Sequence, residues 1–174
     1  MAYKLNVKGV YDRATRSASV GGIMKKNGRW VRGLGGYIGL ADPVTAELWA
    51  IYYGLKMAWE RNKINLVVFY ECREAITIIR NDDPSYPMTM LVDMIRMLLG
   101  ENWTSVDIQH THADANGGAN AVAGYYLGHE GGIREMDEPP EAISHQKPSA
   151  TSSKDSSKPS TKFMFLCFQK FECN

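Results

Sequence analysis

The chain has 174 residues, of which 44% are hydrophobic and 22% are charged, and its formal net charge is +1. This length supports one hydrophobic core and therefore one domain, so two separate cores are not expected. The near-neutral charge excludes a strong overall attraction to nucleic acid or to membranes, so binding to a polyanion must come from a local basic surface. No apolar run approaches the roughly 18 residues that a membrane span needs.

The cysteines and the N-terminus indicate the compartment. Cys72, Cys167 and Cys173 follow neither a paired spacing nor a zinc-binding pattern, so we expect inert thiols in a reducing environment. The N-terminus lacks the charged and then apolar pattern of a secretory signal. These features predict an intracellular protein of the cytoplasm or nucleus.

The first third of the sequence predicts three strands. Residues 4–9 alternate apolar and polar side chains, as a half-buried strand does. Residues 18–26 and 29–38 flank Asn27-Gly28, a pair that favours the left-handed backbone of a two-residue hairpin turn. Within these two strands, glycines at positions 21, 22, 33, 35 and 36 leave room for a helix or a ligand to approach. We expect a helix to be what packs there.

The helix predicted over residues 45–61 is the central element, with Asp42 and Thr45 as competing caps. Its apolar side chains recur at helical spacing and form one stripe: Leu48, Ile51, Tyr52, Leu55 and Trp59. Glu47 lies about a quarter-turn from the centre of this stripe, in the first helical turn. Its carboxylate is therefore expected at the rim of the buried face. On this segment alone, the favoured interpretation of Glu47 is a carboxylate that stabilises the helix N-terminus.

The following segments alternate between strands and helices. Residues 66–70 are a continuous apolar run, typical of a central strand covered on both faces, and a strand after a helix makes a βαβ unit. Helices are predicted over 73–81, 88–99 and 117–127, and a fifth strand over 106–110. In the last helix the side chains expected to face inward are Ala121, Val122 and Tyr125.

The composition changes after Gly132. Residues 144–162 hold seven Ser, two Thr, two Pro and four Lys, too little apolar surface to order the segment. We therefore expect a folded domain over residues 1–132 and a disordered tail over 133–174. The apolar segment 163–168 is too short to span a membrane, and a sticky peptide and a gene-model artefact stay open as explanations.

Several short strings carry a family resemblance: Lys4-Leu-Asn-Val-Lys-Gly9, Gly21-Gly-Ile23 with Asn27-Gly-Arg-Trp30, Ala46-Glu-Leu-Trp-Ala-Ile51, Tyr70-Glu-Cys-Arg-Glu-Ala75, His110-Thr-His-Ala-Asp-Ala-Asn116 and Ala119-Asn-Ala-Val-Ala123. In order and spacing they resemble the ribonuclease H type 1 family, particularly the plant domains related to retroelement reverse transcriptases. The resemblance covers about residues 4–128. It implies an α/β ribonuclease H-like fold, with a five-stranded mixed sheet and helices on both faces.

The resemblance also implies an activity and a site. Enzymes of this family cleave the RNA strand of RNA–DNA hybrids with two divalent cations, Mg²⁺ or Mn²⁺, held by four carboxylates. Of these four positions Glu47 is the one retained unchanged. The family's first and third aspartates fall on Lys8 and Glu71, and the last falls on Asn120. The resemblance places the family's proton-shuttling or product-releasing histidine on His110.

Charge counting argues against two bound metal ions. Lys8, Glu47, Glu71 and Asn120 together carry one net negative charge, whereas four carboxylates would balance two divalent cations. An ammonium group only donates hydrogen bonds, so Lys8 repels the metal that its counterpart would bind. Glu47 and Glu71 are thus weak metal ligands at best, and absence of any cofactor is the alternative. We expect Lys8 to pair with Glu47 or Glu71 and to fill the vacated metal position.

Nucleic-acid binding is a separate property. Lys25, Lys26, Arg29 and Arg32 cluster around the predicted hairpin and are candidate phosphate contacts for an RNA–DNA hybrid or RNA, with a merely solvated turn as the alternative. The main hypothesis is a monomeric, nucleic-acid-binding ribonuclease H-like domain whose hybrid-cleaving site is degraded. The competing hypothesis is a noncatalytic module, derived from a retroelement, that binds nucleic acid or protein.

Overall fold

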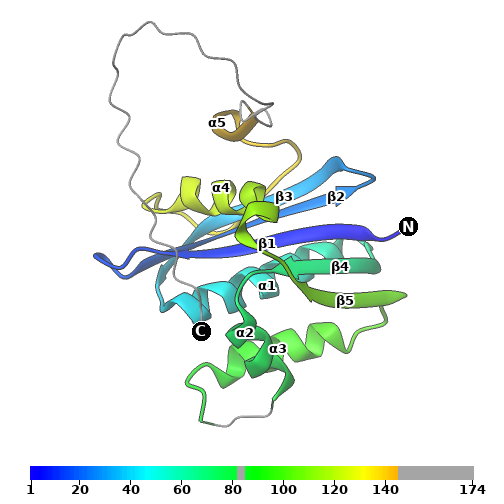
Figure 1. Cartoon of the computed structure of the whole chain (residues 1–174), viewed down its shortest axis with the longest axis horizontal. Coiled ribbons are helices and arrows are strands. Elements are labelled where there is room, and N and C mark those ends of the chain that lie inside the picture. The colour runs from blue at the N-terminus through cyan, green and yellow to red at the C-terminus, as the bar shows by residue number, and fades with distance from the viewer. Residues whose placement is uncertain (82–84, 145–174) are drawn as a thin grey trace, which may run out of the picture.

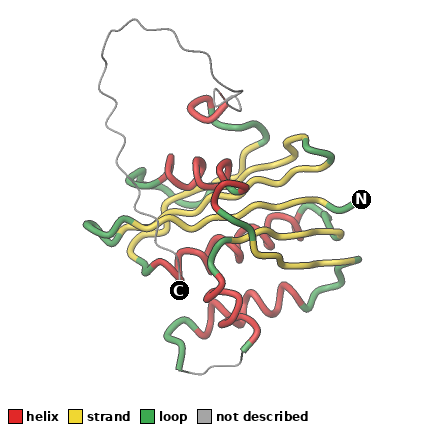
Figure 2. The backbone as a smooth tube through the Cα atoms, viewed as in Figure 1, coloured by secondary structure: helices red, strands yellow, loops and turns green. Residues whose placement is uncertain are grey.

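The computed structural model describes residues 1–81 and 85–144 and shows a mixed sheet with helices on both faces (Figures 1 and 2). Within these residues the sheet has six strands, in the order β5-β4-β1-β2-β3-β6. The predicted α/β architecture is confirmed, but the predicted number of five strands is wrong. The added strand is a short one at the edge next to β3.

The strands form a meander that continues into a parallel half. Their bounds are β1 Tyr3–Tyr11, β2 Ser17–Lys26, β3 Arg29–Leu40, β4 Asn65–Tyr70, β5 Ser105–His110 and β6 Arg134–Met136. β2 runs antiparallel to β1 and β3, whereas β4 is parallel to β1 and β5 is parallel to β4. Asn27 and Gly28 have φ angles of 52° and 75°, which confirms the predicted left-handed hairpin turn.

The helices begin near their predicted positions. Their bounds are α1 Pro43–Glu60, α2 Arg73–Arg80, α3 Thr89–Leu99, the 3₁₀ turn η1 Ala113–Ala115, α4 Gly117–Tyr126 and α5 Glu141–Ser144. Asp42 is the N-cap of α1, because its Oδ1 accepts a hydrogen bond of 2.9 Å from the backbone N–H of Thr45. The two candidate caps therefore act together, since the Thr45 hydroxyl also donates to Asp42.

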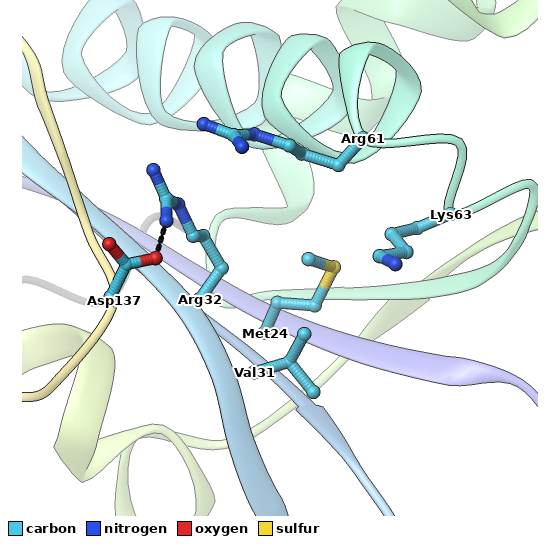
Figure 3. Close-up of a pocket in the computed structure, with 6 residues that line it drawn as sticks. All are labelled: Met24, Val31, Arg32, Arg61, Lys63 and Asp137. Atoms are coloured by element: carbon cyan, nitrogen blue, oxygen red, sulfur yellow. Dashed lines mark ion pairs between the residues drawn. The ribbon is translucent and has the colours of Figure 1, made fainter.

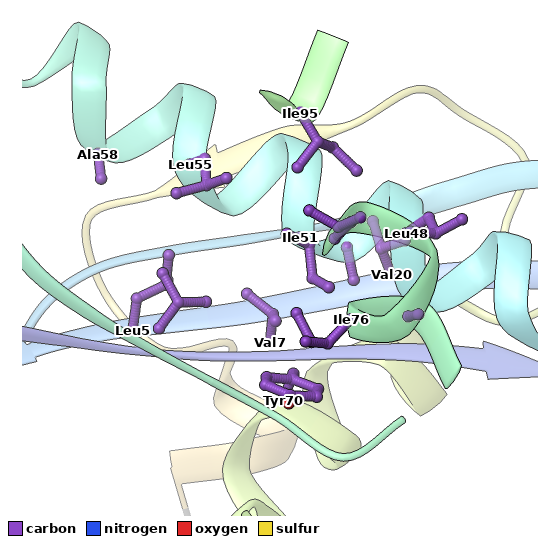
Figure 4. Close-up of a cluster of buried hydrophobic side chains, with 14 of the residues drawn as sticks. Leu5, Val7, Val20, Leu48, Ile51, Leu55, Ala58, Tyr70, Ile76 and Ile95 are labelled. Carbon is purple, nitrogen blue, oxygen red and sulfur yellow. The ribbon is translucent and has the colours of Figure 1, made fainter. Parts of the chain in front are cut away.

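The main core lies between the sheet and α1, with α2 and α3 packed against α1 (Figure 4). Its largest fully buried side chains include Leu5, Leu48, Ile51 and Leu55. Gly9 lets α1 approach β1 closely, since a Cβ there would lie 2.2 Å from the backbone carbon of Ala46. This close approach brings the first turn of α1 directly over the middle of β1.

The opposite face of the sheet is covered by α4. A Cβ on Gly21 would lie 2.4 Å from the backbone nitrogen of Ala123, so at this glycine the helix packs closely, as predicted. Val122 and Ala123 are buried, but Tyr125 is 41% exposed, so its predicted inward orientation is wrong. The aromatic ring that faces the sheet is that of Tyr126, which lies over Gly35.

The described fold extends past the predicted domain boundary at residue 132. β6 pairs antiparallel with β3 from Gly33 to Gly35, and α5 follows it. A strand of three residues is too short to show an alternation of apolar and polar side chains. The pairing of β6 therefore follows from the free backbone groups of β3. The remainder of the predicted tail, including residues 163–168, lies outside the described residues. Within residues 1–81 and 85–144, no helix is both long and apolar enough to cross a membrane.

Candidate functional site

Three elements bring charged side chains together where α1 crosses β1. Lys8 lies in the middle of β1, and Glu71 lies directly after β4. Glu47 is the fifth residue of α1, just past its first turn, because the helix begins at Pro43, two residues earlier than predicted. β4 is parallel to β1 and hydrogen-bonded to it, so the end of β4 lies beside the residues that follow Asn6. The N-terminal part of α4 adds polar side chains from the other face of the sheet.

Lys8 is the centre of this cluster. Its Nζ lies 2.6 Å from Oε1 of Glu47 and 3.1 Å from Oε2 of Glu71. The three side chains are largely buried, with exposed fractions of 20% for Lys8, 5% for Glu47 and 15% for Glu71. The expected ion pair is therefore present, and Lys8 bridges both carboxylates rather than one.

The remaining carboxylate oxygens are also hydrogen-bonded. Oε2 of Glu47 accepts from the backbone N–H of Gly9 at 3.3 Å. Oε1 of Glu71 accepts from Nδ2 of Asn116 at 2.8 Å and from Nδ2 of Asn120 at 2.7 Å. Every carboxylate oxygen of the cluster thus has a donor from the protein itself.

Asn116 is the residue that the sequence analysis missed. It is 1% exposed and, besides Glu71, its Nδ2 donates to the backbone carbonyl of Val7, while its Oδ1 accepts from Asn6. It lies one helical turn before Asn120, and the backbone N–H of Asn120 donates to its carbonyl. That spacing of four residues was the available signal, because side chains so spaced lie on one face of a helix.

Burial and charge act against each other in this cluster. Burial lowers the pKa of Lys8, but the charges and hydrogen bonds of Glu47 and Glu71 outweigh it, so the pKa of Lys8 is raised above its ordinary value. Burial pushes the pKa of Glu47 upward, while the Lys8 ammonium and the Gly9 N–H act in the opposite direction. Lys8 is therefore charged at neutral pH, and it provides the counter-charge that both carboxylates need.

A divalent cation does not fit this arrangement. Mg²⁺ requires an octahedral shell of oxygen ligands, whereas the space between the two carboxylates holds an ammonium group, which only donates. The fourth family position is the amide of Asn120, and its nitrogen points at Glu71. Across the described part of the chain, no group of three or more His, Cys, Asp or Glu residues is arranged to hold a metal ion.

His110 is not hydrogen-bonded to the cluster in the described part of the chain. It ends β5 with its side chain on the same face as Val106 and Ile108, which pack against the core. The ring contacts recorded for it are with Tyr70 at 5.9 Å and His112 at 5.4 Å. Among the described residues no hydrogen bond joins His110 to Lys8, Glu47 or Glu71, although Tyr70, which it contacts, directly precedes Glu71.

The four basic residues of the hairpin do not form one surface. Arg32 pairs in register with the core residue Met24 and forms salt bridges on the α1 face of the sheet. Lys26 lies over the ring of Tyr3, 4.6 Å from its centroid. Lys25 is exposed opposite Lys4 of β1, and Arg29 is exposed at the hairpin tip.

Comparison with known proteins identifies the family. The sequence matches the reverse transcriptase-like family over residues 6–125, which is more than half of the chain. The chain belongs to this family. An Arabidopsis thaliana protein named "putative ribonuclease H protein" is 29% identical over 143 residues, covering 81% of this chain. The chain spans 23% of that relative's length.

Comparison with solved structures confirms the ribonuclease H-like fold. Ribonuclease H1 of the archaeon Halobacterium salinarum aligns with a TM-score of 0.66 at 19% identity, covering 72% of this chain and 97% of that one. LC11 ribonuclease H1, solved in complex with an RNA/DNA hybrid, aligns with a TM-score of 0.64 at 14% identity, covering 72% and 96%. The protease–reverse transcriptase of prototype foamy virus aligns with a TM-score of 0.54 at 14% identity, covering 71% and 20%.

Proposed function

We propose that this chain is a ribonuclease H-like domain that binds nucleic acid without metal-dependent cleavage. The observation that carries the proposal is the position of the Lys8 ammonium between Glu47 and Glu71. In two-metal hydrolysis one ion activates the attacking water and the other stabilises the leaving oxygen. A lysine that donates to both carboxylates supplies neither function.

The polar network has a structural role in place of a catalytic one. Lys8 neutralises part of the negative charge, and the amides of Asn116 and Asn120 hold one oxygen of Glu71. These contacts satisfy carboxylates that would otherwise be buried without partners, which would cost several kcal/mol. The cluster joins β1, α1, β4 and α4, and so stabilises the fold.

A protein of the same fold supports nucleic acid as the ligand. LC11 ribonuclease H1, which has the same fold, was solved with an RNA/DNA hybrid bound. In this chain the exposed Lys25 and Arg29 are the candidate phosphate contacts at the hairpin. Lys26, the cross-strand partner of Arg29, and Arg32 lie on the face opposite to Lys25. Phosphate contacts of this kind give affinity that depends strongly on salt and little on sequence.

The proposal is tested by measuring cleavage and binding in the same buffer. Purified protein is incubated with a labelled RNA–DNA hybrid in millimolar Mg²⁺ or Mn²⁺, and binding of the hybrid is followed by fluorescence anisotropy. We expect saturable binding with no detectable cleavage. Turnover would contradict the noncatalytic part of the proposal, while absence of binding at low salt would contradict the nucleic-acid part.

A further inference from the structure

A second charged site lies between the β2–β3 hairpin and the end of α1. It is a cavity of about 200 Å³ lined by Met24, Val31, Arg32, Arg61, Lys63 and Asp137 (Figure 3). None of these residues belongs to the Lys8 cluster. The apolar side chains form one wall, and three of the six lining residues are cations.

The cations of this site outnumber the carboxylates. Lys26 and Lys63 both lie over the ring of Tyr3, with Nζ atoms 4.6 and 5.2 Å from its centroid. Neither ammonium has a carboxylate partner among the described residues. Burial raises the pKa of Tyr3, but the hydrogen bonds and the charges of both lysines outweigh it, so the pKa of Tyr3 is lowered. An anion in the cavity would supply Lys63, which lines it, with the counter-charge that it lacks.

The two arginines already show how the site binds anionic oxygens. A single oxygen of Glu135, Oε2, accepts from Arg32 Nε at 3.0 Å and from Arg61 Nη2 at 2.9 Å. Asp137 forms a further salt bridge with Arg32, drawn in Figure 3, but its side chain is 85% exposed. A pair this exposed contributes little stability, so another anion can displace Asp137 at small cost.

We propose that this cavity binds a phosphate group, with Asp137 as a displaceable internal ligand. The three cations that line the cavity, Arg32, Arg61 and Lys63, face the carboxylates of Glu135 and Asp137, so displacement of Asp137 leaves two positive charges for a dianion to balance. Guanidinium groups pair with phosphate through paired N–H donors, and lysine adds a point charge. The inference does not depend on whether the Lys8 cluster has lost cleavage.

The test is isothermal titration of the protein with inorganic phosphate at constant ionic strength, with chloride as the balancing anion. We expect saturable binding. Lys63→Gln and Arg61→Gln should each weaken it about fivefold, and Asp137→Asn should strengthen it about threefold, because one charge is removed in each case. Arg80→Gln, which removes an exposed arginine of α2 outside the cavity, is the matched control and should leave phosphate affinity unchanged.

Competition identifies the source of the phosphate. If the cavity takes the phosphodiester of a nucleic acid, a short single-stranded oligonucleotide should displace phosphate, and Lys63→Gln should weaken both. If it takes a free phosphate or a small phosphate ester, the oligonucleotide should not compete. Absence of saturable phosphate binding, or equal weakening by Arg80→Gln, would overturn the proposal. The melting temperature of each free variant establishes that the protein is folded.

Discussion

The Nζ of Lys8 lies 2.6 Å from a carboxylate oxygen of Glu47, in a cluster where related enzymes use metal ions to balance charge. Lys8 lies on β1 and Glu47 near the N-terminus of α1, so the pair joins the two elements at the centre of the fold. In the function that we propose, this covalently attached cation takes the place of the counter-charge that a diffusible ion would supply.

Removal of Lys8 should destabilise the protein strongly. Lys8→Met keeps much of the apolar stem but leaves the buried Glu47 and the largely buried Glu71 without a counter-ion. Breaking a buried pair in this way costs about 3 kcal/mol of unfolding free energy. Urea denaturation measures the change, and Lys4→Met, at an exposed position on the same strand, is the matched control. A loss below about 1 kcal/mol, typical of exposed pairs, would show that the cluster does not depend on Lys8.

The contribution of Lys8 should depend on pH in a defined direction. Its pKa in the folded protein is raised above the ordinary value of 10.5, so the stabilisation is fully present below pH 10.5 and is lost as the pH rises through the higher folded pKa. The difference in unfolding free energy between the unmodified protein and Lys8→Met should therefore be constant from pH 7 to about pH 10 and decrease above it. A difference that already falls below pH 9 would mean that the folded pKa of Lys8 is not raised.

Asn116 should contribute more stability than Asn120. Asn116→Ala removes donors to Glu71 and to the Val7 carbonyl and an acceptor for Asn6, all at a buried position, and should cost about 2 to 3 kcal/mol. Asn120→Ala removes one hydrogen bond to Glu71, which keeps Asn116 and Lys8 as partners, and should cost about 1 kcal/mol. Urea denaturation of both variants compares them. Equal losses would contradict the central position assigned to Asn116.

Much of this arrangement could be predicted because it depends on local patterns. The apolar stripe of α1 places Glu47 at the edge of the buried face, and the family resemblance places Lys8 beside it. Strand alternation alone would point Lys8 away from Leu5 and Val7. The Asn27-Gly28 turn follows from the two residues alone. The orientation of His110 also follows from a local pattern. Alternation with Val106 and Ile108 puts its side chain on the core face.

The unpredicted features depend on tertiary contacts. β6 is three residues long and is defined by its pairing with β3. Its sequence is too short to show a periodic pattern that would predict a strand. The register shift between Met24 and Lys25 decides which face of the sheet each hairpin cation occupies, and a β-bulge cannot be located from residue types alone. The salt bridges of Arg32 with Glu135 and Asp137 join segments about a hundred residues apart.

The response of the melting temperature to Mg²⁺ tests the central claim most directly. A ligand stabilises a protein only as far as it occupies the folded state, so millimolar Mg²⁺ should barely change the melting temperature of the unmodified protein. The double variant Lys8→Asp/Asn120→Asp would hold four carboxylates that repel one another, so its melting temperature should fall without metal and recover with Mg²⁺. If the unmodified protein instead gains as much stability from Mg²⁺ as the double variant, the cluster already holds a metal ion and Lys8 does not replace it.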